Sequence, residues 1–109
     1  MITKLLWFME VKMKQDDYIK KIEGKTEKEV FLYALSTCIW CKKTKEHLKK
    51  LGVAYSYINV DELDEKVKNK FTRDLKKWNP SCSYPTVIID NKECVRGFDP
   101  KELEEKLGL

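Results

Sequence analysis

The chain of 109 residues is long enough for one small domain, and its hydrophobic content of 42% is ordinary for a globular protein. This composition excludes a disordered chain and a collagen-like repeat, and four cysteines are too few for a disulfide-stapled miniprotein. The longest apolar run, Leu5 to Met9, is far shorter than the ~20 residues of a membrane span or the ~7–15-residue core of a signal peptide. We therefore expect a cytoplasmic protein without membrane association, in which closely spaced cysteines serve catalysis or metal binding.

The formal net charge of +4 is concentrated in one short segment. Residues 38–52 contain five lysines and one glutamate, so their charge equals that of the whole chain. The other basic residues are interspersed with acidic ones, without the interleaved aromatic residues that stack on bases. We therefore expect no binding to nucleic acid. The lysine-rich segment is either a solvated helix face or a support for a charged group nearby.

The predicted elements follow an N-terminal extension, residues 1–27, in which residues 11–22 are compatible with a helix. The uninterrupted apolar run over residues 30–35 predicts a strand covered on both faces. Apolar residues at helical spacing over residues 38–51, with Gly52 as a suitable C-cap, predict the first helix. The remaining elements in chain order are a strand at 54–60, a helix at 62–78, strands at 86–89 and 94–96, and a helix that begins at Asp99.

This order predicts an α/β fold for a domain at residues 28–109. The first two strands should be parallel, because a helix connects them in a right-handed crossover. The last two should be antiparallel, because only the tight turn at 90–92 separates them. The result is a four-stranded mixed sheet flanked by helices on both faces, with the extension added to it.

Cys38 and Cys41 lie three positions apart where the first predicted strand leads into a helix. If the helix begins at Cys38, its sulfur faces unpaired N–H groups at the positive end of the helix, which favour a thiolate. Thr37, Lys42 and Lys43 are the expected supports of that thiolate, and Lys45 adds to the positive potential within a turn or two. Cys41 falls on the apolar stripe, shielded from solvent. Cys38 can therefore attack a substrate disulfide and Cys41 can resolve the mixed disulfide; the alternative is two small core residues that happen to be cysteines.

Pro85 stands where a central strand is expected to begin, a place that proline normally avoids. A cis bond between Tyr84 and Pro85 accounts for it, since cis bonds are largely confined to proline. The backbone of Tyr84 would then be free to pair with an extended substrate beside Cys38. The alternative is a simple proline at the start of the strand.

These features resemble the glutaredoxins, within the thioredoxin superfamily. The likeness is carried by the strand 30–35 leading into Cys38-Ile-Trp-Cys41, the helix 42–51, Tyr84-Pro85-Thr86, and Gly97-Phe98-Asp99 before the last helix. The resemblance implies a thioredoxin-like fold and a dithiol–disulfide oxidoreductase that serves electron transfer and cell redox homeostasis. It implies Cys38 as nucleophile, Cys41 as resolving cysteine, and cis Pro85. It also implies that Trp40, Tyr84, Pro85 and Asp99 contact the substrate.

The sequence departs from the glutathione-using members at several positions. Those members usually carry a lysine where Leu35 stands, Pro-Tyr where Ile39-Trp40 stands, and Gly-Gly where Gly97-Phe98 stands. Asp99 is left as a carboxyl partner for the amino end of glutathione. The expected electron donor is therefore open between glutathione, another small thiol, a thioredoxin-reductase-like enzyme and a ferredoxin-linked system. The expected substrate is a protein or low-molecular-weight disulfide, the expected state a monomer, and the only expected redox group the Cys38–Cys41 disulfide, without a bound cofactor or metal.

The remaining cysteines and the single histidine are expected to have simpler roles. Cys82 is predicted on a loop near the active site, either as a third redox thiol or without a role, and Cys94 as a packing residue. The spacing of the four cysteines differs from that of structural zinc sites. His47 lies off the apolar stripe among lysines, which predicts exposure to solvent. Two other functions stay open: an iron–sulfur or metal carrier of the same fold with Cys38 as ligand, and a non-catalytic interaction domain that uses the basic helix.

Overall fold

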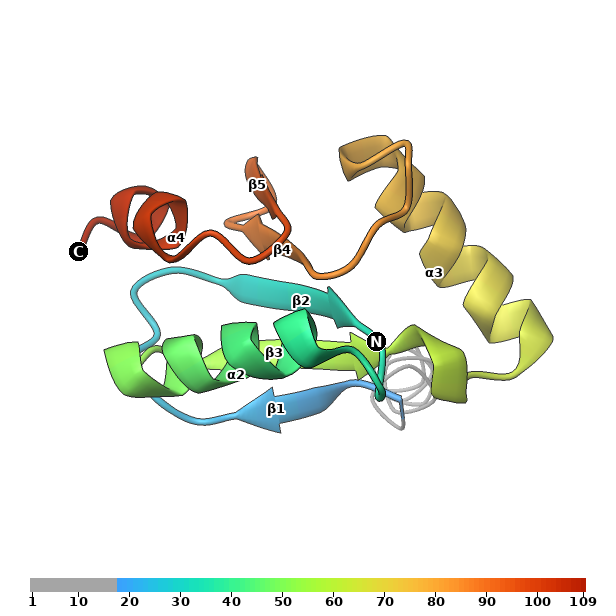
Figure 1. Ribbon diagram of the computed structural model, residues 1–109, viewed down its shortest axis with the longest axis horizontal. Helices are drawn as coiled ribbons and strands as arrows, with labels where there is room; N and C mark the ends of the chain where they lie inside the picture. The colour runs from blue at the N-terminus through green and yellow to red at the C-terminus, as the bar shows by residue number, and fades with distance from the viewer. Residues whose placement is uncertain (1–17) are drawn as a thin grey trace, which may run out of the picture.

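The strand β2 (Val30–Ala34) lies at the centre of the sheet in the computed structural model, which describes residues 18–109 (Figure 1). It pairs in parallel with β3 (Tyr55–Asn59) and antiparallel with β4 (Thr86–Ile89). β5 (Glu93–Arg96) pairs with β4 at one edge, and β1 (Lys20–Ile22) pairs with β3 at the other. The strand order is therefore β1-β3-β2-β4-β5. The mixed sheet and the predicted direction of each strand pair are confirmed.

The sheet has five strands rather than the expected four, because β1 comes from the N-terminal extension. Its last residue, Ile22, packs against the core, and the following backbone is tied to the 52–54 segment. The N–H of Lys25 donates to the carbonyl of Gly52, and the N–H of Ala54 donates to the carbonyl of Lys25, both at 2.8 Å. The expectation of a helix over residues 11–22 is therefore wrong at its end, and residues 11–17 lie outside the described part.

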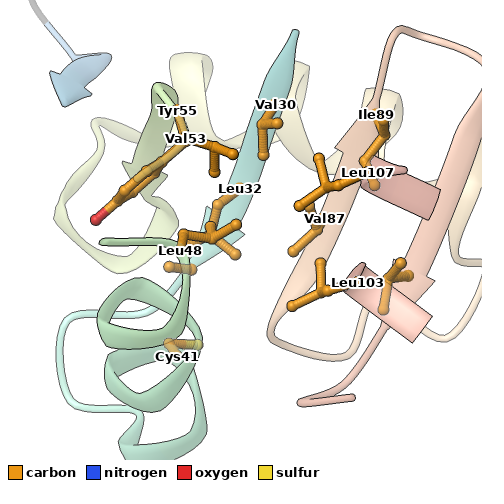
Figure 2. Packing of buried hydrophobic residues seen from close by; sticks show 12 residues of the cluster. Val30, Leu32, Cys41, Leu48, Val53, Tyr55, Val87, Ile89, Leu103 and Leu107 are labelled. Atoms are coloured by element: carbon orange, nitrogen blue, oxygen red, sulfur yellow. The ribbon is translucent and has the colours of Figure 1, made fainter. Parts of the chain in front are cut away.

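Two helices cover one face of the sheet. They are α2 (Ile39–Leu51), which ends at Gly52 in the left-handed conformation, and α4 (Pro100–Leu107). Their inward side chains meet those of the central strands in one apolar cluster, which Figure 2 shows from close by. In that view the side chains of Cys41 and Leu48 come from α2, and those of Leu103 and Leu107 from α4. The cluster fixes the first turn of α2 against the carboxyl end of β2.

The helix α3 (Glu65–Trp78) covers the opposite face and completes the predicted arrangement of helices on both sides. It begins three residues later than expected, because a 3-10 turn at Val60–Glu62 comes first. Leu63 then buries its side chain from an extended backbone. The predicted apolar stripe packs in a second cluster with Tyr33, Ile58 and Ile88 from the sheet. Among residues 18–109, no helix is long and apolar enough to cross a membrane.

Candidate active site

The sulfur of Cys38 lies at the N-terminus of α2. Cys38 is the N-cap residue, with an extended backbone, and its Sγ accepts a hydrogen bond from the N–H of Cys41 at 3.2 Å. The N–H of Cys38 itself donates to the carbonyl of Leu35 at 3.3 Å, which holds the connection between β2 and α2 in a tight turn. The side chain is half-buried, so its sulfur is both supplied with a helix N–H donor and open to a substrate.

Cys41 lies one turn deeper in the same helix and is fully buried (Figure 2). Burial, with the hydrogen bond to the sulfur of Cys38, raises the pKa of the Cys41 thiol to about 12. Both thiols are free rather than joined in a disulfide. The predicted asymmetry between an accessible and a shielded sulfur is therefore present in the geometry.

Lys45 follows Cys41 by one turn and lies on the same side of α2. Its Nζ is 4.1 Å from the ring centroid of Tyr57 and 3.4 Å from Oδ1 of Asn59. This ammonium lowers the pKa of Cys41 and so opposes the effect of burial. Burial in turn lowers the pKa of Lys45. Among the lysines of residues 38–52, Lys45 is therefore the one whose charge affects the pKa of Cys41.

The residues expected to support the Cys38 thiolate lie exposed around the first turn of α2. Lys43 places its Nζ 4.6 Å from the ring centroid of Trp40, so its charge lies over an indole. Thr37 and Lys42 are exposed, and within residues 18–109 their side chains form no hydrogen bond or ion pair. The contact of the Cys38 sulfur that the structure gives is the helix N–H donor described above.

The turn before Cys38 is anchored by the carboxylate of Asp61, which no local sequence pattern predicts. Asp61 accepts a hydrogen bond from the N–H of Ser36 at 2.9 Å, and its second oxygen accepts one from the Ser36 hydroxyl. These two bonds lower the pKa of Asp61. A carboxylate that caps a neighbouring turn can be recognised from the sequence, but Ser36 and Asp61 are 25 residues apart.

The bond between Tyr84 and Pro85 is cis, as predicted. Pro85 is buried, and its carbonyl accepts a hydrogen bond from the N–H of Gly97 at 2.8 Å. The ring of Tyr84 is half-buried and packs against the same apolar cluster as Cys38. Among residues 18–109, no hydrogen bond engages the backbone of Tyr84. A free backbone segment therefore lies on the cluster that borders the Cys38 sulfur.

Trp40 and Asp99 lie at the starts of α2 and α4, respectively. Trp40 is half-exposed, and its ring stacks on Phe98 with centroids 6.0 Å apart and planes at 26°. Asp99 is the N-cap of α4, and its Oδ1 accepts a hydrogen bond from the N–H of Glu102 at 3.0 Å. The stack between Trp40 and Phe98 joins the two ends of the site across 58 residues of sequence, and no local pattern predicts such a contact.

His47 does not face solvent as expected. Its side chain is 17% exposed, and its Nε2 lies 3.9 Å from a carboxylate oxygen of Glu104. The rings of His47 and Phe98 lie at 85° to one another with centroids 6.3 Å apart. The expectation is wrong because α4 packs beside this part of α2, which the spacing along α2 alone does not indicate. Cys82 and Cys94 are partly buried against the second cluster. Among the described residues, no group of three or more His, Cys, Asp or Glu side chains is arranged to hold a metal ion.

Comparisons with known proteins agree with this geometry. The model of the glutaredoxin family matches residues 30–94, which hold both cysteines of the site and Pro85. The chain belongs to the glutaredoxin family. Glutaredoxin 1 of Rickettsia prowazekii is 36% identical over 79 residues, which cover 72% of this chain and 79% of that protein.

Two solved structures show the same fold over most of the chain. The glutaredoxin of Methanosarcina mazei has a TM-score of 0.80 and 41% identity, covering 85% of this chain and 90% of its own. The methanoredoxin of Methanosarcina acetivorans has a TM-score of 0.79 and 40% identity, covering 83% and 96%. The fold is thioredoxin-like, and the glutaredoxin assignment supports thiol–disulfide oxidoreductase chemistry at the general level.

Proposed function

We propose that the protein is a dithiol oxidoreductase in which Cys38 attacks a substrate disulfide and Cys41 resolves the mixed disulfide. The observation that carries this proposal is the difference between the two sulfurs. One is half-buried and accepts a hydrogen bond at a helix N-terminus, and the other is fully buried with a raised pKa. An accessible thiolate suits the first attack, whereas a shielded thiol suits a second attack that is confined to its neighbour.

The two steps balance as follows. The Cys38 thiolate attacks one substrate sulfur, the substrate S–S bond breaks, and the other substrate sulfur leaves as a thiolate that takes a proton from water. Cys41 then loses its proton and attacks the sulfur of Cys38, which releases the second half of the substrate as a thiol. The substrate gains two electrons and two protons, and the protein retains a Cys38–Cys41 disulfide. A thiol or a reductase must then reduce this disulfide.

The order of the steps follows from the surroundings of Cys41. In the reduced protein, the hydrogen bond to Cys38 and the charge of Cys38 both raise the pKa of Cys41. Once the sulfur of Cys38 is part of a mixed disulfide, it carries no charge, so this electrostatic effect disappears. The hydrogen bond with the Leu35 backbone and the charge of Lys45, which both lower the pKa of Cys41, are then opposed by burial alone. Cys41 therefore becomes easier to deprotonate when its thiolate is needed.

The substrate is held by groups around Cys38. The unpaired backbone of Tyr84, next to Pro85, pairs with an extended segment of the substrate. Trp40 contacts the substrate from the first turn of α2. Asp99 caps α4 through Oδ1, so its other oxygen is the one that receives a substrate amino group. The electron donor is a thiol, for which glutathione is one candidate, or a reductase, and the substrate is a protein or small-molecule disulfide.

The test uses the fully reduced protein and 2-hydroxyethyl disulfide, with thiol release followed over time. Cys38→Ser should lower the rate at least about 100-fold, because the attacking sulfur is lost. Cys94→Ser is the matched control, since Cys94 is a partly buried cysteine that packs against the other face of the sheet, and it should react at the rate of the unmodified protein. Full activity of Cys38→Ser would disprove the proposal.

A further inference from the structure

An exposed apolar surface adjoins Cys38 at the first turn of α2. Ile39 is 62% exposed and Trp40 is 51% exposed, and both directly follow Cys38 in the chain. Within residues 18–109, Leu109 is the other large hydrophobic side chain with comparable exposure. Single exposed apolar residues are common, but two in succession beside a reactive group leave an apolar surface that a partner can cover.

This surface is held in place rather than free to reorient. The ring of Trp40 stacks on Phe98, which precedes α4, and the edge of Phe98 is in turn contacted by the half-buried ring of His47. The Nζ of Lys43 lies 4.6 Å from the Trp40 centroid, a favourable cation–π distance. A rigid aromatic side chain provides contact area without a large loss of conformational entropy on binding.

The charge at the first turn of α2 is positive and unpaired. The first turn of α2 contains no acidic residue. Among the described residues, neither Lys42 nor Lys43 forms an ion pair, and both are exposed. The N-terminus of α2 adds its own partial positive charge. A partner with a carboxylate next to an apolar side chain therefore complements both properties of this region.

We propose that Ile39, Trp40, Phe98 and Lys43 form a docking surface for protein disulfides whose attacked cysteine is flanked by an aromatic or large aliphatic residue and an acidic residue. This inference rests on the proposed role of Cys38 and adds the class of substrate. The distance of 4.6 Å between Nζ of Lys43 and the Trp40 ring sets the separation expected between the acidic and the apolar side chain of the partner. Because an extended chain advances about 3.3 Å per residue, the apolar and acidic residues of the partner lie within about two positions of one another.

A small disulfide such as oxidised glutathione provides only part of this complementarity. It has carboxylates for Lys43 but no large apolar group to cover Ile39 and Trp40. A protein segment provides both, and its backbone can also pair with that of Tyr84. The docking surface therefore favours a protein segment over a small peptide that carries charge alone.

The experiment compares two synthetic peptides of equal length, each closed by one internal disulfide. They are identical except that one carries Phe-Glu and the other Gly-Gln beside one cysteine. The fully reduced protein should reduce the Phe-Glu peptide about tenfold faster in second-order rate constant, because its side chains cover the aromatic surface and meet a cation. Trp40→Ala should lower this preference to less than about threefold, and Lys43→Gln should lower it about two- to threefold.

Two control variants remove an exposed apolar side chain and an exposed lysine outside the docking surface. Leu109→Ala removes an exposed apolar side chain at the chain end, and Lys50→Gln removes an exposed lysine from the last turn of α2. Both should keep the full preference for the Phe-Glu peptide. A preference below about threefold in the unmodified protein, or one that Trp40→Ala leaves intact, would overturn the docking surface.

A third substrate, 2-hydroxyethyl disulfide, separates the two proposals. Failure to reduce it and both peptides would refute the function proposed for Cys38. Reduction of all three without a preference between the peptides would refute only the docking surface. Circular dichroism of each variant confirms that a lost preference does not reflect a lost fold.

Discussion

Lys45 provides the side-chain charge that, after a hydrogen bond with the Leu35 backbone, opposes the effect of burial on the Cys41 thiol. Its ammonium lowers the pKa of Cys41, whereas burial and the neighbouring Cys38 raise it. The ammonium is held over the Tyr57 ring and near Asn59, so its position relative to Cys41 is fixed by contacts with β3. The rate of the resolving step should therefore depend on this one lysine.

Lys45→Met should raise the pKa of Cys41 further and slow the attack of Cys41 on the mixed disulfide. We expect a loss of about two- to threefold at neutral pH, because the charge of Lys45 favours the Cys41 thiolate but is the smallest of the influences on its pKa. The pH profile of the resolving step should move to higher pH. The measurement is rapid mixing of the reduced protein with excess 2-hydroxyethyl disulfide at several pH values, with the decay of the transient Cys38 adduct followed by acid quenching and mass spectrometry.

The matched control for that variant is Lys49→Met, one turn further along α2 and exposed. It should leave both the rate and the pH profile of the resolving step unchanged. A profile that moves by the same amount in both variants would show that the effect comes from net charge and not from the position of Lys45.

Among the elements, β1 depends on a close approach of two backbone segments. Gly24 follows β1, and a Cβ built on it would lie 2.7 Å from backbone atoms of Gly52, Val53 and Ala54. Real Cβ atoms do not tolerate such distances, and the neighbouring atoms are main chain that cannot rotate away. The glycine therefore allows β1 to lie beside the end of α2 and the start of β3.

Gly24→Ala should displace β1 from the sheet edge and lower the free energy of unfolding by about 1–3 kcal/mol. Urea titration of the variant and of the unmodified protein gives the difference. Glu23→Ala, a change at the exposed neighbouring residue, should alter stability by less than about 0.5 kcal/mol. Equal stability of Gly24→Ala and the unmodified protein would mean that this contact is not needed.

The elements that the sequence predicted were those with strong local signals. The buried strand 30–34, the stripe of α2 and the Asp99-Pro100 start of α4 each depend on spacing or capping within a few residues. What was missed depends on contacts between distant segments. β1 is a strand only because β3 offers it an edge, and His47 is half-buried only because α4 packs beside it.

The features of the candidate site also separate into those that a local pattern predicts and those that depend on contacts between distant residues. The position of Cys38 at the start of α2, the burial of Cys41 and the cis bond before Pro85 could be anticipated from a local motif and an unusually placed proline. The anchor between Ser36 and Asp61 and the stack between Trp40 and Phe98 could not, because each joins residues at least 25 positions apart. Charge counting gave the net charge of this segment but not the contacts of its lysines, since only side-chain packing places Lys43 over Trp40 and Lys45 over Tyr57.

For the whole molecule, titratable groups buried in the two apolar clusters make the free energy of unfolding depend on pH in the alkaline range. Tyr33 belongs to the second cluster, and its burial, with smaller effects of Asp74 and Tyr84, raises its pKa from 10.0 to about 12. The group is protonated in both states below pH 10. Between pH 10 and 12 only the unfolded chain releases the proton, so stability falls as the pH rises. Cys41 acts in the same direction, from its ordinary value of 9.0 upward.

Tyr33→Phe should remove this component of the alkaline destabilisation. The free energy of unfolding of the variant should decline less steeply between pH 10 and 12, by on the order of 1–2 kcal/mol over the window. Urea titrations at pH 7, 10 and 11.5 provide the comparison, and the value at pH 7 corrects for the lost hydroxyl. Parallel curves for the two proteins over the whole range would contradict the role assigned to Tyr33.

The proposal that Cys38 attacks the substrate and Cys41 resolves the mixed disulfide is tested most directly by trapping that mixed disulfide. Reduced Cys41→Ser protein is mixed with 2-hydroxyethyl disulfide, and the intact mass and its proteolytic peptides are measured. We predict one stable adduct per molecule, located on Cys38, whereas the unmodified protein ends with a Cys38–Cys41 disulfide and no adduct. An adduct on Cys82 or Cys94, or a stable adduct in the unmodified protein, would contradict this account.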